Sequence, residues 1–287
     1  MAGGLVSIKI GRGECKPQLG ANMGLSMEIS CLRPPVTRPG RLGARMAGWQ
    51  VLLMLPLLLK LCGTAWAGRP LQTEDAGVLE QGECELESYT ARQHVKQASH
   101  DRGASLQLAC GLGRSTQLAL ALQRNRGDGE ASRGQLWSGK TRLWSAAAEA
   151  PEGASLTLAY GLGWRRDVNR AWHQRAGNAA LVFSTPLGEA SPLSLHAQLG
   201  HAHEKSEGLK RRSTSWGLAL EHQGWGAVAP MAELFGDDRD GTWWNLGLRV
   251  TLRPETLFVY MSYGRKLGAG PAPRLLTLGL KLSFGGP

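Results

Sequence analysis

The sequence predicts an all-β protein, a closed antiparallel transmembrane β-barrel of about twelve strands, and three observations support this. Residues 83–284 contain about twelve segments in which large apolar residues alternate with small or polar ones. A short apolar run before them, residues 51–59, is followed by Ala65-Trp66-Ala67. The last segment closes on Phe284, with only three residues after it. Together these features are typical of a barrel in the outer membrane of a Gram-negative bacterium.

The N-terminal part of the chain has the features of a targeting sequence. The run VLLMLPLLL at residues 51–59 is too short to span a bilayer, which takes about 20 apolar residues. It suits the core of a signal peptide that ends in an A-x-A cleavage site. We therefore predict a signal peptide over residues 46–67. Residues 1–45 have no sustained period and are interpreted as an untranslated or disordered extension, because later methionines offer other starts.

The predicted strands follow residues 68–82, which show no alternation and which we place in the periplasm. The strands cover residues 83–90, 103–112, 116–124, 134–144, 153–164, 175–185, 191–201, 213–223, 226–236, 242–252, 255–264 and 274–284. Connections after odd-numbered strands are long and charged, such as 92–102, and those after even-numbered strands are mostly short, such as 113–115. A barrel with both termini in the periplasm has tight periplasmic turns and longer outer loops. We therefore expect the charged connections on the outside of the cell.

The last strand shows the alternation most clearly. Its large side chains share one face: Leu276, Leu278, Leu280, Leu282 and Phe284. Small or polar residues, among them Lys281, occupy the other face. Such a strand faces lipid on one side and water on the other. Its aromatic end resembles the terminal signal of bacterial outer-membrane barrels, so we expect the barrel-assembly machinery as a partner through Phe284.

Soluble barrels and sandwiches also alternate, and are the main alternative fold. In them the face away from the core meets water and is rich in Lys, Glu and Thr. Here that face is mostly small, as in Ser155, Thr157, Ala159 and Gly161, which suits a narrow lumen. Eight of the ten Trp residues follow residue 67, mostly near the ends of alternating segments, as at the two interfaces of a membrane barrel. The alternative for these rings is a soluble core.

The formal net charge of +10 does not indicate nucleic-acid binding. Of the 33 Lys and Arg and the 23 Asp and Glu, eight and two fall in residues 1–67, which leaves 25 and 21 for the predicted mature part. The charges of that part are scattered through connections rather than gathered in one patch. We expect outer-membrane lipid and lipopolysaccharide as partners, and no nucleic acid.

A resemblance to a known family adds to this interpretation. Residues 69–77 read RPLQTEDAG and residues 82–87 read GECELE, followed much later by AELFG at 232–236 and NLGLR at 245–249. These stretches resemble the MetA-pathway of phenol degradation family, in which RPL-x-T-[DE]-DA precedes the first strand. Glu74 stands where Asp is commoner. The resemblance covers most of residues 68–284 and implies a membrane barrel that admits small hydrophobic or aromatic solutes, without catalytic residues.

The predicted function is therefore passive passage of small solutes, plausibly hydrophobic or aromatic. The selective groups would be the charged or polar residues that the alternation turns toward the lumen: Glu85, Glu87, His196, Gln198, Glu221, Glu233, Arg249 and Lys281. Charges in such a wall need partners, so acids and bases are expected to pair across the pore and narrow it. The alternative is that they brace a closed structural barrel.

Enzyme chemistry is the other alternative, since some membrane barrels are lipid hydrolases. That chemistry needs a base within hydrogen-bond reach of a lipid-facing hydroxyl. Ser194 and His196 share a face, but by their phase this face is the lumen. His201-x-His203 beside Glu204 is interpreted as a solvated cluster rather than a metal site. We predict no catalytic residue, no metal and no cofactor.

Cys84 and Cys110 are the only cysteines after the predicted cleavage site. The first two strands form a hairpin, and the midpoint of this pair is residue 97, inside the predicted connection 92–102. Both residues also fall in the outward phase. Opposed positions bring Cα atoms to about 4.5–5.5 Å, within disulfide range, and the periplasm permits oxidation. A disulfide is one prediction, and two free cysteines facing lipid are the other.

Overall fold

The computed structural model describes residues 18–19, 27–28, 71–94, 100–127, 130–146, 153–167, 171–172, 174–188, 191–206, 209–222, 225–268 and 272–286. The predicted signal peptide over residues 46–67 lies outside these residues. So does the N-terminal extension, apart from β1 (Gln18–Leu19) and β2 (Met27–Glu28), which form a two-stranded antiparallel sheet.

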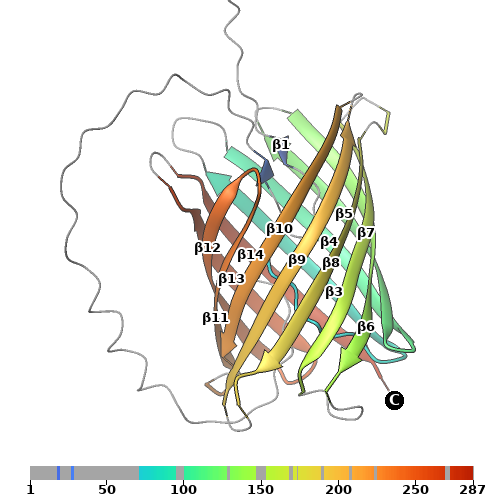
Figure 1. The fold of residues 1–287 in the computed structure, drawn as a ribbon, viewed down its shortest axis with the longest axis vertical. Coiled ribbons are helices and arrows are strands. Elements are labelled where there is room, and N and C mark those ends of the chain that lie inside the picture. Colours follow the sequence, from blue (N-terminus) through green and yellow to red (C-terminus); the bar gives the residue numbers. More distant parts are fainter. Residues whose placement is uncertain are drawn as a thin grey trace, which may run out of the picture.

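Twelve strands form one closed antiparallel barrel, which confirms the predicted fold class (Figure 1). Each strand pairs with its neighbours in sequence, and β14 closes the barrel on β3. The strands are β3 (Glu83–His94), β4 (His100–Gly113), β5 (Thr116–Gly127), β6 (Glu130–Ser145), β7 (Ser155–Asp167), β8 (Gln174–Pro186), β9 (Leu193–Ser206), β10 (Leu209–His222), β11 (Val228–Asp237), β12 (Gly241–Arg253), β13 (Leu257–Lys266) and β14 (Arg274–Gly285). Among the described residues, no helix is long and apolar enough to cross a membrane.

The barrel has a terminal end, where β3 begins and β14 finishes, and an opposite, distal end. Most strands run further toward the distal end than the alternation of apolar residues indicates. The predicted charged connection 92–102 is largely strand, because β3 continues to His94 and β4 starts at His100. The predicted difference in loop length between the two ends is therefore wrong. A β-ladder is held by backbone hydrogen bonds, so it continues past the last apolar side chain wherever the side chains can face solvent.

The outer face of the barrel is apolar and the inner face is polar. Leu106, Leu278 and Leu246 are 46–56% exposed on the outside, whereas Glu221 and Asn245 are 0–1% exposed on the inside. A continuous apolar exterior of this kind is made for lipid, because it would be costly in water. The fold is that of a transmembrane barrel.

The tryptophans follow the predicted pattern in part. Trp137, Trp144, Trp216 and Trp225 are exposed on the outer side, as in an interfacial girdle. Trp243 is different: its side chain is 4% exposed, lies inside the barrel and donates its indole N–H to Asp240. Odd-numbered residues of β12 face the lumen, and this alternation places Trp243 inside the barrel.

Candidate functional site

Residues 71–82 are called the inner segment here, and residues 71–79 of this segment lie inside the barrel. Leu71, Ala76, Val78 and Leu79 are 0–7% exposed. For residues 71–79 this corrects the prediction that residues 68–82 form a periplasmic segment. Residues 80–82 are exposed, and residues 68–70 lie outside the described part. The sequence gives no sign of the position, because an irregular segment has the same lack of alternation in water and inside a barrel.

Wall side chains accept hydrogen bonds from the backbone of the inner segment. The amides of Gln72 and Thr73 donate to the carboxylate of Glu233 on β11, at 2.8–2.9 Å. The amide of Glu74 donates to Gln198 on β9 at 2.8 Å. An irregular segment cannot satisfy its own amides, so each buried amide needs such a partner.

The contacts continue along the rest of the segment. The amide of Ala76 donates to Ser184 Oγ on β8 at 2.8 Å, and Thr157 on β7 donates to the Ala76 carbonyl at 2.7 Å. The amide of Leu79 donates to Gln117 on β5 at 2.8 Å. The inner segment is therefore held from β5 round to β11 by side chains of the wall.

Lys140 on β6 adds a charge contact to the same segment. Its Nζ lies 2.9 Å from Glu74 Oε2 and 3.8 Å from Asp75 Oδ2, and donates to the Asp75 carbonyl at 3.0 Å. The Lys140 side chain is 12% exposed, so little water screens the pair.

Two glycines of the wall make room for the inner segment. A Cβ at Gly217 on β10 would lie 2.4 Å from Thr73 Oγ1, and a Cβ at Gly111 on β4 would lie 1.9 Å from the Glu80 carbonyl oxygen. Any other residue would collide with the segment at these positions. The absence of a side chain at these two positions therefore allows the inner segment to lie directly against the wall.

A second group of polar residues lies on the wall toward the terminal end. Ser184 Oγ and His196 Nδ1 are 2.8 Å apart, and His196 Nε2 lies 3.5 Å from Glu221 Oε2. Arg249 donates to Glu221 Oε1 at 2.5 Å. The carboxylate of Glu221 is fully buried and needs this cation, because an unpaired buried charge is very costly.

This second group of residues, called the polar row from here on, continues on the other side of Arg249. Its guanidinium lies 5.8 Å from the centroid of the Phe258 ring, and Lys281 Nζ lies 5.9 Å from the same centroid. Lys281 pairs with Glu85 at 2.6 Å, and the Tyr260 hydroxyl donates to Glu87 at 2.6 Å. Each of these two bases thus has an acid as its partner in this part of the lumen.

The structure places all eight predicted lumen residues on the inner face. Gln198 and Glu233 contact the inner segment, and the other six belong to the row from His196 to Glu85 and Glu87. Sequence reasoning missed Lys140, Ser184 and Gln117. The phase of β6 would have found Lys140, because it shares the inward register of Leu136 and Ser138.

A cavity of about 80 Å³ lies between the inner segment and the wall. It has room for a few waters and is much smaller than an ordinary ligand pocket. Its charged lining residues are Glu74, Asp75, Glu85, Glu87, Lys140 and Lys281. The lumen beside the inner segment is therefore narrow and strongly polar.

The lumen is more aromatic further toward the distal end. Tyr89, Trp243 and Tyr260 are buried together with Leu275, and Phe235 packs against them. The Phe235 and Trp243 rings stack at 6.1 Å between centroids. Polar and apolar parts of the lumen thus lie one above the other.

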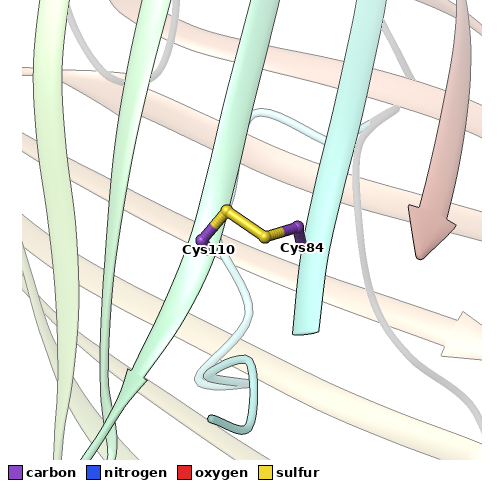
Figure 2. The surroundings of a disulfide bond; sticks show 2 residues. All are labelled: Cys84 and Cys110. Carbon is purple, nitrogen blue, oxygen red and sulfur yellow. A yellow bond between two sulfur atoms is a disulfide. The ribbon is translucent and has the colours of Figure 1, made fainter. Parts of the chain in front are cut away.

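Cys84 and Cys110 are joined by a disulfide on the outer face (Figure 2). The two residues are direct partners in the ladder between β3 and β4, and their Cα atoms are 4.1 Å apart. The bridge ties the first strand to the second near the terminal end.

Among the described residues, no group of three or more His, Cys, Asp or Glu side chains is placed to hold a metal ion. Ser194 and His196 are both buried on the inner face. His201 and His203 are exposed and in the outward phase, whereas Glu204 is in the inward phase.

Comparisons with known proteins are consistent with the fold. The family model described as "Uncharacterised conserved protein UCP029691" matches residues 57–284. Curated proteins gave no match. Among solved structures, the COG4313 outer membrane channel from Pseudomonas putida F1 is similar, with a TM-score of 0.52 and 13% identity over 73% of this chain and 98% of that one. The translocator domain of autotransporter NalP from Neisseria meningitidis has a TM-score of 0.50 and 13% identity, over 71% and 89%. The fold is that of bacterial outer-membrane barrels.

Proposed function

We propose that this chain, which belongs to the family of uncharacterised conserved protein UCP029691, is a passive outer-membrane channel for small solutes. The inner segment forms the constriction of this channel. The observation that carries this proposal is the continuous contact of residues 71–79 with wall residues from β5 to β11. A segment held by side chains, rather than woven into the sheet, can shift without opening the barrel.

The polar row favours a conducting lumen over a packed core. Soluble barrels of this size fill their interior with apolar side chains, because buried charges bring little net stability. Here Glu221, Arg249, Lys281 and Glu85 occupy that space. Rings of charge of this kind set the selectivity of pores.

For the solute we propose a small hydrophobic or aromatic compound. In the distal part of the lumen Phe235 is partly exposed beside the buried Tyr89, Trp243 and Tyr260, and its ring can stack on a planar solute. The resemblance of residues 69–77 to the MetA-pathway of phenol degradation family points to the same class of compound. The solute would then pass the charged constriction as a neutral or singly charged molecule.

A closed structural barrel is the second candidate. It is favoured by the same inner segment, if the hydrogen bonds to Glu233, Gln198 and Ser184 never release. A lipid hydrolase has weaker support, although Ser184, His196 and Glu221 are aligned. The Ser184 hydroxyl faces the lumen and accepts the Ala76 amide, away from any lipid.

Delivery to the membrane belongs to the same proposal. The predicted signal peptide over residues 46–67 would export the chain. The barrel-assembly machinery would then bind the strand that ends at Phe284, whose ring is exposed on the outer face. The terminal end would face the periplasm.

Solute uptake by proteoliposomes tests the channel proposal. The mature protein is compared with a variant lacking residues 71–79, using uncharged aromatic solutes, a benzoate-type anion and a sugar of similar size. We expect slow uptake that favours the aromatic solutes, and much faster, unselective uptake by the deletion variant. No uptake by either protein would overturn the channel and favour a structural barrel. Release of fatty acid from the liposomes would instead indicate an enzyme.

A further inference from the structure

Basic side chains surround the distal half of the barrel on its outer face. They lie on ten of the twelve strands, and only β11 and β12 lack them. We call this set the distal basic belt: Arg92, Arg102, Arg124, Arg126, Arg133, Arg166, Arg175, Lys205, Lys210, Arg212, Arg265 and Arg274. Nine of these twelve residues lie outside the strands that the alternation predicts. The longer strands turn them into an ordered array.

The acidic side chains of the distal half avoid the outer face. Among the described side chains, no Asp or Glu stands on the outward face of a barrel strand. Acids of this half, such as Asp101 and Asp237, are buried on the inner face instead. The belt has no described carboxylate as an ion-pair partner. Arg166 lies 5.2 Å from the centroid of the Trp172 ring. The other cations of the belt face the surroundings of the protein.

Belt residues also stand directly opposite one another across strands. Arg102 on β4 is the ladder partner of both Arg92 on β3 and Arg126 on β5. Further like-charged partners occur elsewhere around the barrel: Arg124 with Arg133, Arg133 with Arg166, Arg265 with Arg274, Arg175 with Lys205, and Lys205 with Lys210. Like charges directly opposite destabilise a sheet. Repeating them around the barrel is favourable only if an anion lies between them.

The belt lies at the edge of the apolar band. On β14 the outward residues run from Phe284 to Leu276 and are then followed by Arg274. The distance from Phe284 to Leu276, eight residues along the strand, is about 27 Å at about 3.4 Å per residue. With a strand tilt of about 40°, the height is about 20 Å, close to the apolar band of such barrels. The basic side chains therefore stand at the level of lipid headgroups.

We propose that the distal basic belt binds the phosphate groups of lipopolysaccharide in the outer leaflet. Arginine is suited to this ligand, because its planar guanidinium bonds two phosphate oxygens at once. A phosphate between Arg92, Arg102 and Arg126 converts three repelling cations into one bound site. The inference rests on the outer-membrane location proposed above but not on channel activity, so uptake and lipid binding can fail separately.

The test compares two double variants that lose the same charge. Arg102→Gln/Arg126→Gln removes two of the three cations at the site formed with Arg92. Arg114→Gln/Arg253→Gln removes two exposed arginines at the turns of the terminal end. Binding of rough lipopolysaccharide to the purified mature protein in a neutral detergent is measured for each. Enzymatically dephosphorylated lipopolysaccharide and inorganic phosphate serve as comparison ligands.

We expect the belt variant to bind lipopolysaccharide at least about tenfold more weakly than wild type, since each basic residue contributes measurably at an anionic surface. The control variant should bind like wild type. Dephosphorylated lipopolysaccharide should bind wild type as weakly as the intact lipid binds the belt variant. Inorganic phosphate at the same concentration should not compete, because it occupies one such site at a time, whereas the phosphates of one lipid molecule are linked and bind several basic residues together.

Thermal unfolding gives a second measurement. The difference in melting temperature between the belt variant and wild type should reverse when lipopolysaccharide is added. Without lipid, the belt variant should melt at the same temperature as wild type or higher, because repulsion is removed. With lipopolysaccharide, wild type should melt higher. Equal binding by both variants, or equal affinity for the dephosphorylated lipid, would overturn the proposal. The comparison of lipids on wild type alone remains decisive if the belt variant fails to fold.

Discussion

Glu233 accepts the backbone amide of Gln72 through both carboxylate oxygens, at 2.8 and 2.9 Å, although the residues are 161 positions apart. The same carboxylate accepts the Thr73 amide and the side-chain amide of Asn245. It is 4% exposed, so these donors replace the hydrogen bonds that its oxygens would make with water. One side chain of the wall thus fixes the start of the described inner segment.

Glu233→Gln is expected to loosen the inner segment and raise conductance. Hydrogen bonds to a charged group contribute about 1.5–3 kcal/mol each, and the amide keeps only one weaker acceptor oxygen. Single-channel recording in planar bilayers should show a larger or more often open state than wild type. Glu255→Gln, at an exposed turn, is the matched control and should conduct like wild type. Identical recordings for Glu233→Gln would mean that this contact does not limit the pore.

Lys140→Gln is expected to make the channel more selective for cations. The cavity beside the inner segment is lined by four acids, Glu74, Asp75, Glu85 and Glu87, and the substitution leaves only Lys281 to balance them. In a salt gradient, the reversal potential should move toward the value for the cation. Lys140→Arg keeps the charge and should leave the potential near wild type. An unchanged potential in Lys140→Gln would show that ions do not pass this cavity.

The alternation of side chains predicts most of the fold. It locates all twelve barrel strands, because a wall between lipid and water forces a period of two on every strand. It does not locate the distal ends of β3 and β4, where both faces of the wall meet polar surroundings and the apolar signal stops. The alternation therefore predicts Arg92 and Arg102 in a loop, although they lie in strands.

The candidate site is predictable only where it belongs to the wall. The phase of each strand gives the inward position of Glu221, Arg249 and Lys281. The inner segment has no period of its own, so no pattern distinguishes it from a periplasmic extension. Its position depends on contacts with residues such as Glu233, more than 150 positions away, which a local pattern cannot show.

Gly217→Ala is expected to displace the inner segment without removing any hydrogen-bonding group. The new Cβ would lie 2.4 Å from Thr73 Oγ1, so the segment or β10 must move. Overpacking of this kind costs about 1–3 kcal/mol. Uptake by proteoliposomes should rise while heat-modifiable migration shows an intact barrel. Gly163→Ala is the control, because its Cβ would meet its nearest neighbour at 3.5 Å, an ordinary contact. Equal uptake by the two variants would argue against a constriction at Thr73.

The disulfide is expected to stabilise the start of the barrel. Cys84 and Cys110 enclose a loop with a sequence separation of 26, and closing a loop of that length removes about 3.5 kcal/mol of chain entropy from the unfolded state. Reduction, or the double substitution Cys84→Ser/Cys110→Ser, should lower the temperature at which the barrel loses its heat-modifiable migration.

Thiol labelling provides the direct measurement for this last prediction. The mature chain, denatured without reductant, should show no free thiol, and two after reduction. Reductant should lower the melting temperature of wild type and leave that of the double variant unchanged, which separates loss of the bridge from loss of the side chains. Two free thiols per chain before reduction would contradict the bridge and leave two cysteines facing lipid.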